Sequence, residues 1–269
     1  MSKFLRGQHL VGGADVDPNI ADAPVFCIQN SVTASALTST TADTNYPLSN
    51  LANPATFLEW RGTSTSAETI TVTIANDASD YVGIAAHNFG SEPRTIKIQG
   101  DAGAGYVDLS EEFTPADDGP LLFKFAQAGY TGLRVVLGAG STVPRMAILY
   151  AGLSLTSQRN IYVGHRPINL NQTVKQISPY SENGHFLGRI ITAQRNETQV
   201  ELENLTPMWV RGNLDPFIVQ ARERPFFFAW RPYTYSQAVG FVWLTGDPAP
   251  SNSRADGMMS VSMTMAGVV

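Results

Sequence analysis

The side chains that could do chemistry are few in this sequence and stand far apart along it. The four histidines, His9, His87, His165 and His185, are isolated from one another, whereas zinc sites usually contain ligands in close pairs. Cys27 is the only cysteine, so neither a disulfide within the chain nor a cysteine-based zinc site is possible. These residues lead us to expect no metal and no cofactor.

Calcium is a separate case, because loop carboxylates supply the hard oxygen ligands that this ion needs. Asp77 with Asp80, and Asp101 with Asp108, lie in turn-like segments and could contribute such oxygens. Their spacing matches no defined calcium-binding loop, so a calcium ion is left open.

Paired acidic residues give little support for hydrolysis. Glu111-Glu112 and Asp117-Asp118 are adjacent, and adjacent side chains on a strand point to opposite faces. A glycosidase needs two carboxyl groups that face one cleft at roughly 5–10 Å. The Gly-x-Ser-x-Gly and His-Glu-x-x-His motifs are both absent. We therefore expect no enzyme activity and no catalytic residue.

Four residues could instead bind a sugar at the rim of a β domain. Trp60 is either a core residue or a stacking platform, because its ring serves both purposes. Arg61 could contact an acidic sugar or a neighbouring subunit, or it could pair with Glu59. His87 and Asn88 end an apolar strand, where they either bond to loop carbonyls or touch a ligand.

Composition and charge exclude other classes of function. Charged residues make up 15 % of the chain, against roughly 25 % in an average soluble domain. The deficit fits either buried subunit contacts or strand surfaces rich in Ser and Thr. The net charge is −5 and no basic run exists, so we expect no nucleic-acid partner. No run of 18 apolar residues or signal-peptide core is present, so we expect no membrane span and synthesis in the cytoplasm.

Apolar residues alternate with polar ones along most of the chain, which is typical of half-buried strands. The clearest alternating sets are Ile70-Val72-Ile74, Ile96-Ile98, Leu121-Phe123-Phe125, Leu133-Val135-Leu137, Val200-Leu202 and Val261-Met263-Met265. Turn signals such as Asn76-Asp77 and Gly103 to Gly105 lie between them. Two short helices are predicted, from Thr206-Pro207 to Gly212 and from Asp215-Pro216 to about Arg222. The pattern predicts an all-β protein built as a sandwich, jelly roll or barrel.

The residue composition of the sequence changes near residues 154–160. Residues 36 to 155, before this boundary, form a run of predicted strands. Residues 156–269, after it, are richer in Tyr, Trp, Arg and Asn. Residues 1–35 are polar and then briefly apolar, and could pair with the C-terminal half. In that case the first module would be an insertion.

An aromatic and basic cluster surrounds residues 225–232. Three consecutive Phe residues cannot obey simple alternation, so this segment is either a strand buried on both faces or part of a subunit contact. Aromatic residues and Arg are enriched in the cores of interfaces. The candidate interface residues are Arg222, Arg224, Phe226, Phe228, Trp230, Arg231, Tyr233 and Tyr235.

The first module resembles the discoidin-like, galactose-binding type of β-sandwich. The resemblance rests on Asn45 to Leu51 followed by Glu59-Trp60-Arg61, on Tyr81 to Asn88, and on Ile148 to Gly152. It implies a discoidin-like jelly-roll β-sandwich at 36–155, and the residues before it predict an N-terminal strand segment at 1–35 that could pair with the C-terminal domain.

The second half resembles the C-terminal part of siphophage tail proteins that carry such a sandwich. The segments that carry this likeness are Tyr162 to Pro167, Ser181 to Gly184 with Phe186 to Arg189, and Pro225 to Pro232. It implies a second β-rich, barrel-like tail-assembly domain at 156–269 with one or two short helices.

The resemblance implies a distal-tail or baseplate-hub protein of the virion. Such proteins form rings, here a trimer or hexamer, that join the tail tube to the tip and the host-adsorption apparatus. The expected partners are other copies of the chain, the tail tube, and baseplate hub or fibre proteins. The alternative is a carbohydrate-binding protein that contacts host-surface glycans, with Trp60, Arg61, His87 and Asn88 at its rim.

Overall fold

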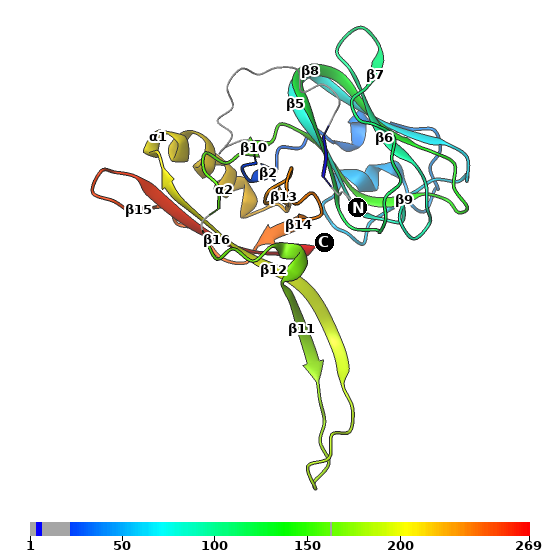
Figure 1. Ribbon diagram of the computed structural model, residues 1–269. Coiled ribbons are helices and arrows are strands. Elements are labelled where there is room, and N and C mark those ends of the chain that lie inside the picture. Colours follow the sequence, from blue (N-terminus) through cyan, green and yellow to red (C-terminus); the bar gives the residue numbers. More distant parts are fainter. Residues whose placement is uncertain (1–3, 7–21, 162) are drawn as a thin grey trace.

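A computed structural model describes residues 4–6, 22–161 and 163–269 of the chain. Strands predominate and form two eight-stranded sheets within these residues (Figure 1). The predicted all-β class with a short helical segment is therefore confirmed.

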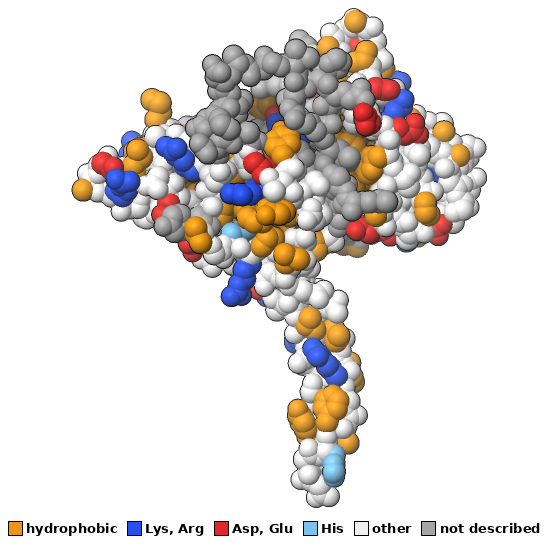
Figure 2. Space-filling model, viewed as in Figure 1, with side chains coloured by type: hydrophobic (Ala, Val, Ile, Leu, Met, Phe, Trp, Pro, Cys, Tyr) orange, Lys and Arg blue, Asp and Glu red, His pale blue; other side chains and the backbone are white. Residues whose placement is uncertain are grey.

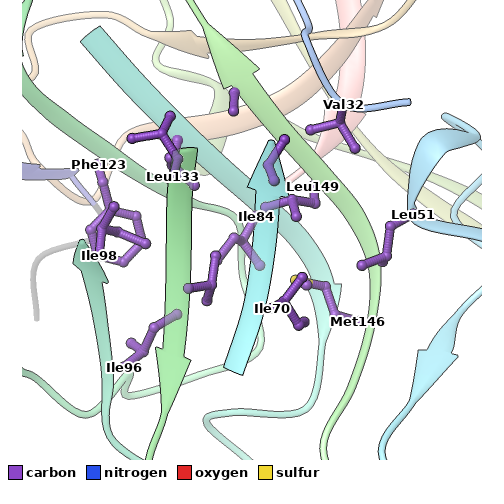
Figure 3. Packing of buried hydrophobic residues seen from close by; sticks show 14 of the residues in the cluster. Val32, Leu51, Ile70, Ile84, Ile96, Ile98, Phe123, Leu133, Met146 and Leu149 are labelled. Carbon is purple, nitrogen blue, oxygen red and sulfur yellow. The ribbon is translucent and has the colours of Figure 1, made fainter. Parts of the chain in front are cut away.

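The first sheet curls around its own core. It contains β1 (Phe4–Arg6), β3 (Leu37–Ser39), β4 (Trp60–Arg61), β5 (Glu68–His87), β6 (Ile96–Asp101), β7 (Tyr106–Asp108), β8 (Leu121–Leu137) and β9 (Arg145–Gly152). The main path runs β4-β9-β5-β8-β6-β7, with β3 on β5 and β1 parallel to β8. Figure 3 shows side chains from these strands, including Ile70, Ile84 and Phe123, meeting in the enclosed space.

The two longest strands make the curl possible. Strands β5 and β8 pair along almost their whole length, with shifts in register between Thr73 and Asp77 and between Ser79 and Tyr81. Such irregularities bend a strand and increase its twist. The turn predicted at Asn76-Asp77 is wrong, because the backbone of β5 continues through it as a bulged strand.

The second sheet is antiparallel and follows the order β10-β2-β13-β14-β16-β12-β11, with β15 on β16. Its strands are β2 (Val25–Cys27), β10 (Leu155–Thr156), β11 (Gln172–Ile177), β12 (Ile190–Leu205), β13 (Phe226–Ala229), β14 (Val239–Leu244), β15 (Ser251–Asn252) and β16 (Met259–Val268). Three short 3-10 turns, η1 (Ala34–Ala36), η2 (Leu48–Ala52) and η3 (Ile168–Leu170), complete the connections.

One nearly continuous helical segment covers a face of the second sheet. It comprises α1 (Pro207–Trp209), a π-helical turn η4 (Val210–Leu214) and α2 (Asp215–Ala221). Thr206 begins it as expected, since its hydroxyl accepts from the Trp209 amide at 3.4 Å. The predicted end at Gly212 is wrong, because the Asp215 amide bonds back to the Val210 carbonyl and carries the backbone onward.

A third apolar cluster joins the two sheets. Tyr81 and Ala85 of β5 point toward the second sheet, while Val82 and Ile84 point into the curled core. Phe227 of β13 faces this junction, and its ring lies 5.7 Å edge-on from the ring of Tyr150. The middle strands are therefore buried on both faces, which explains why their sequences are nearly continuous apolar runs.

A glycine sets how closely the sheets approach. A β-carbon placed on Gly83 of β5 would lie 2.6 Å from the ring of Phe227. The position therefore requires glycine for this packing, because a side chain would push the aromatic ring away.

Within the described residues, the chain passes from the second sheet to the first after β2 and returns to the second sheet after β9, and both crossings are bonded to the curled sheet. The N-terminal strand β2 pairs with β13 and β10 of the second sheet, and the next residues return to the first. The Ser31 amide donates to the Ala151 carbonyl at 2.7 Å, and the Tyr81 hydroxyl donates to the Gln29 carbonyl. Both crossings are thus fixed to the curled sheet.

Buried charge holds the second crossing. The Asp80 carboxylate accepts from the Ser154 amide at 2.8 Å and from the Ser154 hydroxyl at 2.9 Å, and it forms an ion pair with Lys124. Because Asp80 and Lys124 satisfy each other, the pair can lie inside the protein.

Removing the ring at the junction tests whether the two sheets share one core. We expect Phe227→Ala to lower the free energy of unfolding by about 3–5 kcal/mol, the usual cost of deleting a buried ring. Phe57→Ala is the matched control, since Phe57 is 81 % exposed, and it should change stability by less than about 0.5 kcal/mol. Urea denaturation measures both values. Equal midpoints for the two variants would contradict a shared core.

Candidate functional site

A long β-hairpin leaves the body of the molecule, and we call residues 172–196 the arm. It consists of β11 and the first part of β12, paired from Gln172 with Asn196 to Ile177 with Ile190. Figure 1 shows that the arm extends beyond the other strands of the second sheet, and no other described segment lies against its outer part. Most of its side chains are exposed.

The shaft of the arm is apolar although it is exposed. Its large apolar side chains, each between 49 % and 64 % exposed, are Ile177, Tyr180, Phe186, Leu187, Ile190 and Ile191. The rings of Tyr180 and Phe186 meet edge-on at 5.9 Å. Contiguous exposed apolar surface on a protein usually marks a site of interaction.

The turn at the end of the arm is polar. The Ser181 amide donates to the His185 carbonyl at 2.8 Å, and the His185 amide donates to the Ser181 hydroxyl at 3.1 Å. Gly184 has φ +78°, a left-handed conformation that favours glycine. Apolar side chains therefore lie along the shaft and behind the turn.

An apolar hollow of about 290 Å³ lies at the base of the arm, and we call it the aromatic pocket. Its lining residues are Pro167, Asn169, Leu170, Trp230, Tyr235, Gln237 and Ala238. The rings of Trp230 and Tyr235 are stacked, 5.0 Å apart and only 10° from parallel. Leu170 is 78 % exposed and belongs to η3, directly before the arm. Figure 2 shows hydrophobic side chains along the arm and a further group on the body just above its base.

The structure divides the aromatic cluster of residues 222–235 into interior and surface. Phe226 and Phe228 are fully buried beneath the helical segment, while Phe227 faces the first sheet. The three Phe residues thus form a strand buried on both faces, the first of the two alternatives.

The flanking residues of that cluster reach the surface. Trp230 and Arg231 are half-buried, with the guanidinium 5.7 Å from the centre of the indole ring, and Tyr233 and Tyr235 are exposed. Arg222 and Arg224 are also exposed, and Arg222 forms an ion pair with Asp247 at 3.3 Å. A role for these six residues in an interface stays a prediction.

Three of the four sugar-binding candidates are interior residues. The Trp60 side chain is completely buried, and its indole N–H donates to the Thr41 carbonyl at 3.2 Å. His87 Nε2 lies 2.8 Å from the Gly119 carbonyl, and the Asn88 amide group donates to the Val143 carbonyl at 3.2 Å. An unexposed ring has no face for a sugar, so Trp60 takes the core role of its two alternatives.

Arg61 alone of the four lies at the surface. Its guanidinium stacks 3.6 Å above the ring of Tyr46 and pairs with Glu59, which raises the pKa of Arg61 through their hydrogen bond. The preceding loop also carries Phe57, which is 81 % exposed. Sequence reasoning missed Phe57, because it lies in a loop without periodicity and nothing local distinguishes an exposed from a buried ring there.

A polar hollow of about 500 Å³ lies beside the base of the arm. Its lining includes His165, Glu197, Gln199, Glu201 and Thr264. His165 Nδ1 lies 2.9 Å from the Gln199 carbonyl, and the imidazole ring packs 4.8 Å from Trp230. Burial lowers the pKa of His165, and the hydrogen bond to the carbonyl partly opposes this shift. Because the shift is downward, the ring is neutral at neutral pH.

In the part of the chain that the structure describes, no three His, Cys, Asp or Glu side chains gather as a potential metal site. Among the same residues, no helix has both the length and the apolar character needed to cross a membrane.

Comparisons with known proteins find partial likeness in solved structures only. No family model and no curated protein matches the chain. A structure titled SpGH29 is similar over 47 % of this chain and 28 % of its own, with 8 % identity and a TM-score of 0.41. A module named CpGH89CBM32-5 from Clostridium perfringens, in complex with GalNAc-β-1,3-galactose, matches 43 % of this chain and 93 % of its own, with 11 % identity and a TM-score of 0.38.

A chitosan-binding module from Paenibacillus sp. IK-5 gives a similar result. It matches 46 % of this chain and 98 % of its own, with 15 % identity and a TM-score of 0.38. Each of these matches covers less than half of the present chain, so none assigns it a ligand or an activity.

Burial of the His165 ring, which lowers its pKa, predicts a pH dependence. Because the folded pKa lies below the unfolded value of about 6.5, the unfolded state binds the proton more tightly, and stability falls as pH drops below about 6.5. We expect the urea midpoint to fall less in His165→Gln than in the wild type on acidification. His185→Gln, a change on the exposed arm, should keep the wild-type dependence. Identical pH profiles for all three proteins would contradict this assignment.

Proposed function

We propose that this chain is a structural assembly protein of a bacteriophage tail tip, and that it binds protein neighbours through the arm and the aromatic pocket. The observation that carries the proposal is the set of exposed apolar side chains on the outer part of the arm, beyond its bonds to β16 and Ile168 at Asn196. Covering such a surface is favourable in proportion to the apolar area removed from water.

The assignment to a tail tip rests on the sequence resemblance. Two of the segments that carry this resemblance include residues at the surface of the molecule. The segment from Ser181 to Arg189 forms the end of the arm, and the segment from Pro225 to Pro232 contains β13 and leads into the aromatic pocket at Trp230. The end of the arm and Trp230 are the parts of these segments that reach the surface, whereas Phe226 to Phe228 belong to the core.

The rest of the molecule suits a scaffold. The junction between the sheets is dry and aromatic, so the body can hold the arm and the pocket in fixed relation. Rigid presentation lowers the entropy lost when partners dock. The low content of charged residues also reduces the desolvation cost of burying the surface between subunits.

Shortening the arm tests the proposal. Lys175 and Ala193 face each other across the hairpin, so residues 176–192 can be replaced by Asn-Gly, which forms a tight two-residue turn. Because the removed side chains are mostly exposed, we expect stability to change by no more than about 1 kcal/mol. In the phage that encodes the chain, we expect the shortened protein to be made but to be missing from purified virions by mass spectrometry.

A matched control shortens another exposed hairpin, with residues 102–105 between β6 and β7 replaced by Asn-Gly, and should be incorporated normally. Absence of the wild-type chain from virions, or normal incorporation of the arm-shortened chain, would contradict the proposal.

Glycan binding by the first sheet is the second candidate function. The favouring observations are the exposed ring of Phe57 and, four residues later in the chain, Arg61 stacked on Tyr46, since an aromatic face and a charged donor suit a sugar.

A glycan array with the full chain tests this candidate. If a glycan binds, we expect Phe57→Ala to weaken it about tenfold, which corresponds to roughly 1.4 kcal/mol of lost contact. Phe186→Ala, which removes an exposed ring from the arm, should leave the affinity unchanged. Silence of the whole array would exclude glycan binding by this rim.

A further inference from the structure

We infer that the aromatic pocket of one copy of this chain binds the arm of a second copy. This inference rests on the proposed function and names its partner. The arm is a convex apolar feature and the pocket is a concave one, and both belong to one chain.

The distribution of apolar residues on the arm favours a protein partner over a lipid bilayer. A hairpin that enters a membrane needs its apolar side chains at its leading end, because polar groups are costly to bury in lipid. Here the leading turn is Ser181-Glu182-Asn183-Gly184, and the apolar residues lie behind it. An arm of this kind suits docking along its side, with the turn left in water.

Charge favours a second copy as that partner. Between residues 172 and 191 the arm carries Lys175 and Arg189 against a single acid, Glu182, whereas acidic residues are in excess over the whole chain. The polar hollow at the base of the arm contains Arg166 as well as Glu201 and Glu197, and Glu197 already pairs with Arg195 at 2.6 Å. The acidic excess therefore belongs to the rest of the chain as a whole, and it attracts the basic arm of a second copy and assists encounter.

The size and position of the pocket fit one or two side chains of the arm. The hollow of about 290 Å³ has the stacked rings of Trp230 and Tyr235 in its wall and Leu170 at its edge. Tyr180, Phe186 and Leu187 are the exposed large apolar side chains nearest the turn of the arm, and Leu187 and Phe186 are the candidates to enter the pocket.

An arm cannot fill the pocket of its own chain. Leu170 lies just before β11, while Leu187 lies beyond the paired end of the hairpin at Ile177 and Ile190. At about 3.3 Å per residue, the extended strand separates them by roughly 20 Å or more. The contact is therefore between copies and head-to-tail, the type that closes into a ring when its rotation permits.

Disulfide cross-linking between two variants, each of which carries one added cysteine, tests the inference. Full-length Leu187→Cys and Leu170→Cys are purified separately, mixed and oxidised, and disulfide dimers are counted on a non-reducing gel. The native Cys27 is completely buried and its pKa is raised by burial, so it does not compete. We expect the mixture to form mixed dimers about tenfold faster than Leu187→Cys mixed with Met208→Cys, a variant at an equally exposed site elsewhere.

The outcomes separate the possibilities. Preferred coupling of positions 187 and 170 supports the inference. Equal rates with Met208→Cys as partner would overturn it, and so would faster coupling of Leu187→Cys with itself, which would indicate pairing of two arms.

Charge substitution gives an independent readout. We expect Leu187→Asp or Leu170→Asp to weaken self-association by about tenfold in sedimentation at high protein concentration, as loss of a central apolar anchor does. Met208→Asp should have no effect. If neither variant differs from Met208→Asp in self-association, the inference fails. If arm shortening nevertheless removes the chain from virions, the proposed function stands, and another tail protein is the partner of the arm.

Discussion

The packing of the two sheets against each other is the constraint on which the rest of the structure depends. Phe227 of the second sheet fits over Gly83 of the first and meets the ring of Tyr150, whose hydroxyl donates to the Pro225 carbonyl at 3.1 Å. Because the strands on both sides of this junction are also covered on their outer faces, they are apolar at nearly every position. Neither sheet would keep its buried surface out of water alone.

This junction also fixes the surfaces that face outward. The strand that carries Phe227 continues within three residues to Trp230, the wall of the aromatic pocket. Strand β12 packs on β16 in the body and then continues beyond it as half of the arm. The ion pair of Asp80 with Lys124 holds the second crossing between the sheets, where Asp80 also accepts from Ser154. The ionisable side chains of the interior thus largely stabilise the fold.

Alternation in the sequence predicted the strands well but not what covers them. Val200 and Leu202 alternate with polar residues and are buried, as expected for a half-buried strand. Ile177 and Ile190 have the same apolar character and are exposed on the arm, because their strands extend past the body. Local pattern carries no information about how far a hairpin reaches, so the arm could not be predicted.

The candidate site was predicted in part for the same reason. Aromatic and basic residues at 222–235 marked the pocket region, but Phe226 and Phe228 turned out to be core because a two-faced strand resembles an apolar contact surface in sequence. The rim residue Trp60 was resolved only by its tertiary surroundings. The helical backbone continues past Gly212, so a single glycine does not end a helical segment whose buried face continues to Phe217 and Ile218.

Hydrogen exchange on the isolated chain and on its assembled form tests the central claim most directly, namely that a single rigid core presents an exposed arm for assembly. We predict that amides of β5, β9 and β13 exchange most slowly and with one common free energy, since both sheets open only together. Amides of the arm should exchange quickly in the isolated chain and become protected on assembly. Separate opening of the two sheets, or an arm whose exchange is unchanged by assembly, would contradict the account.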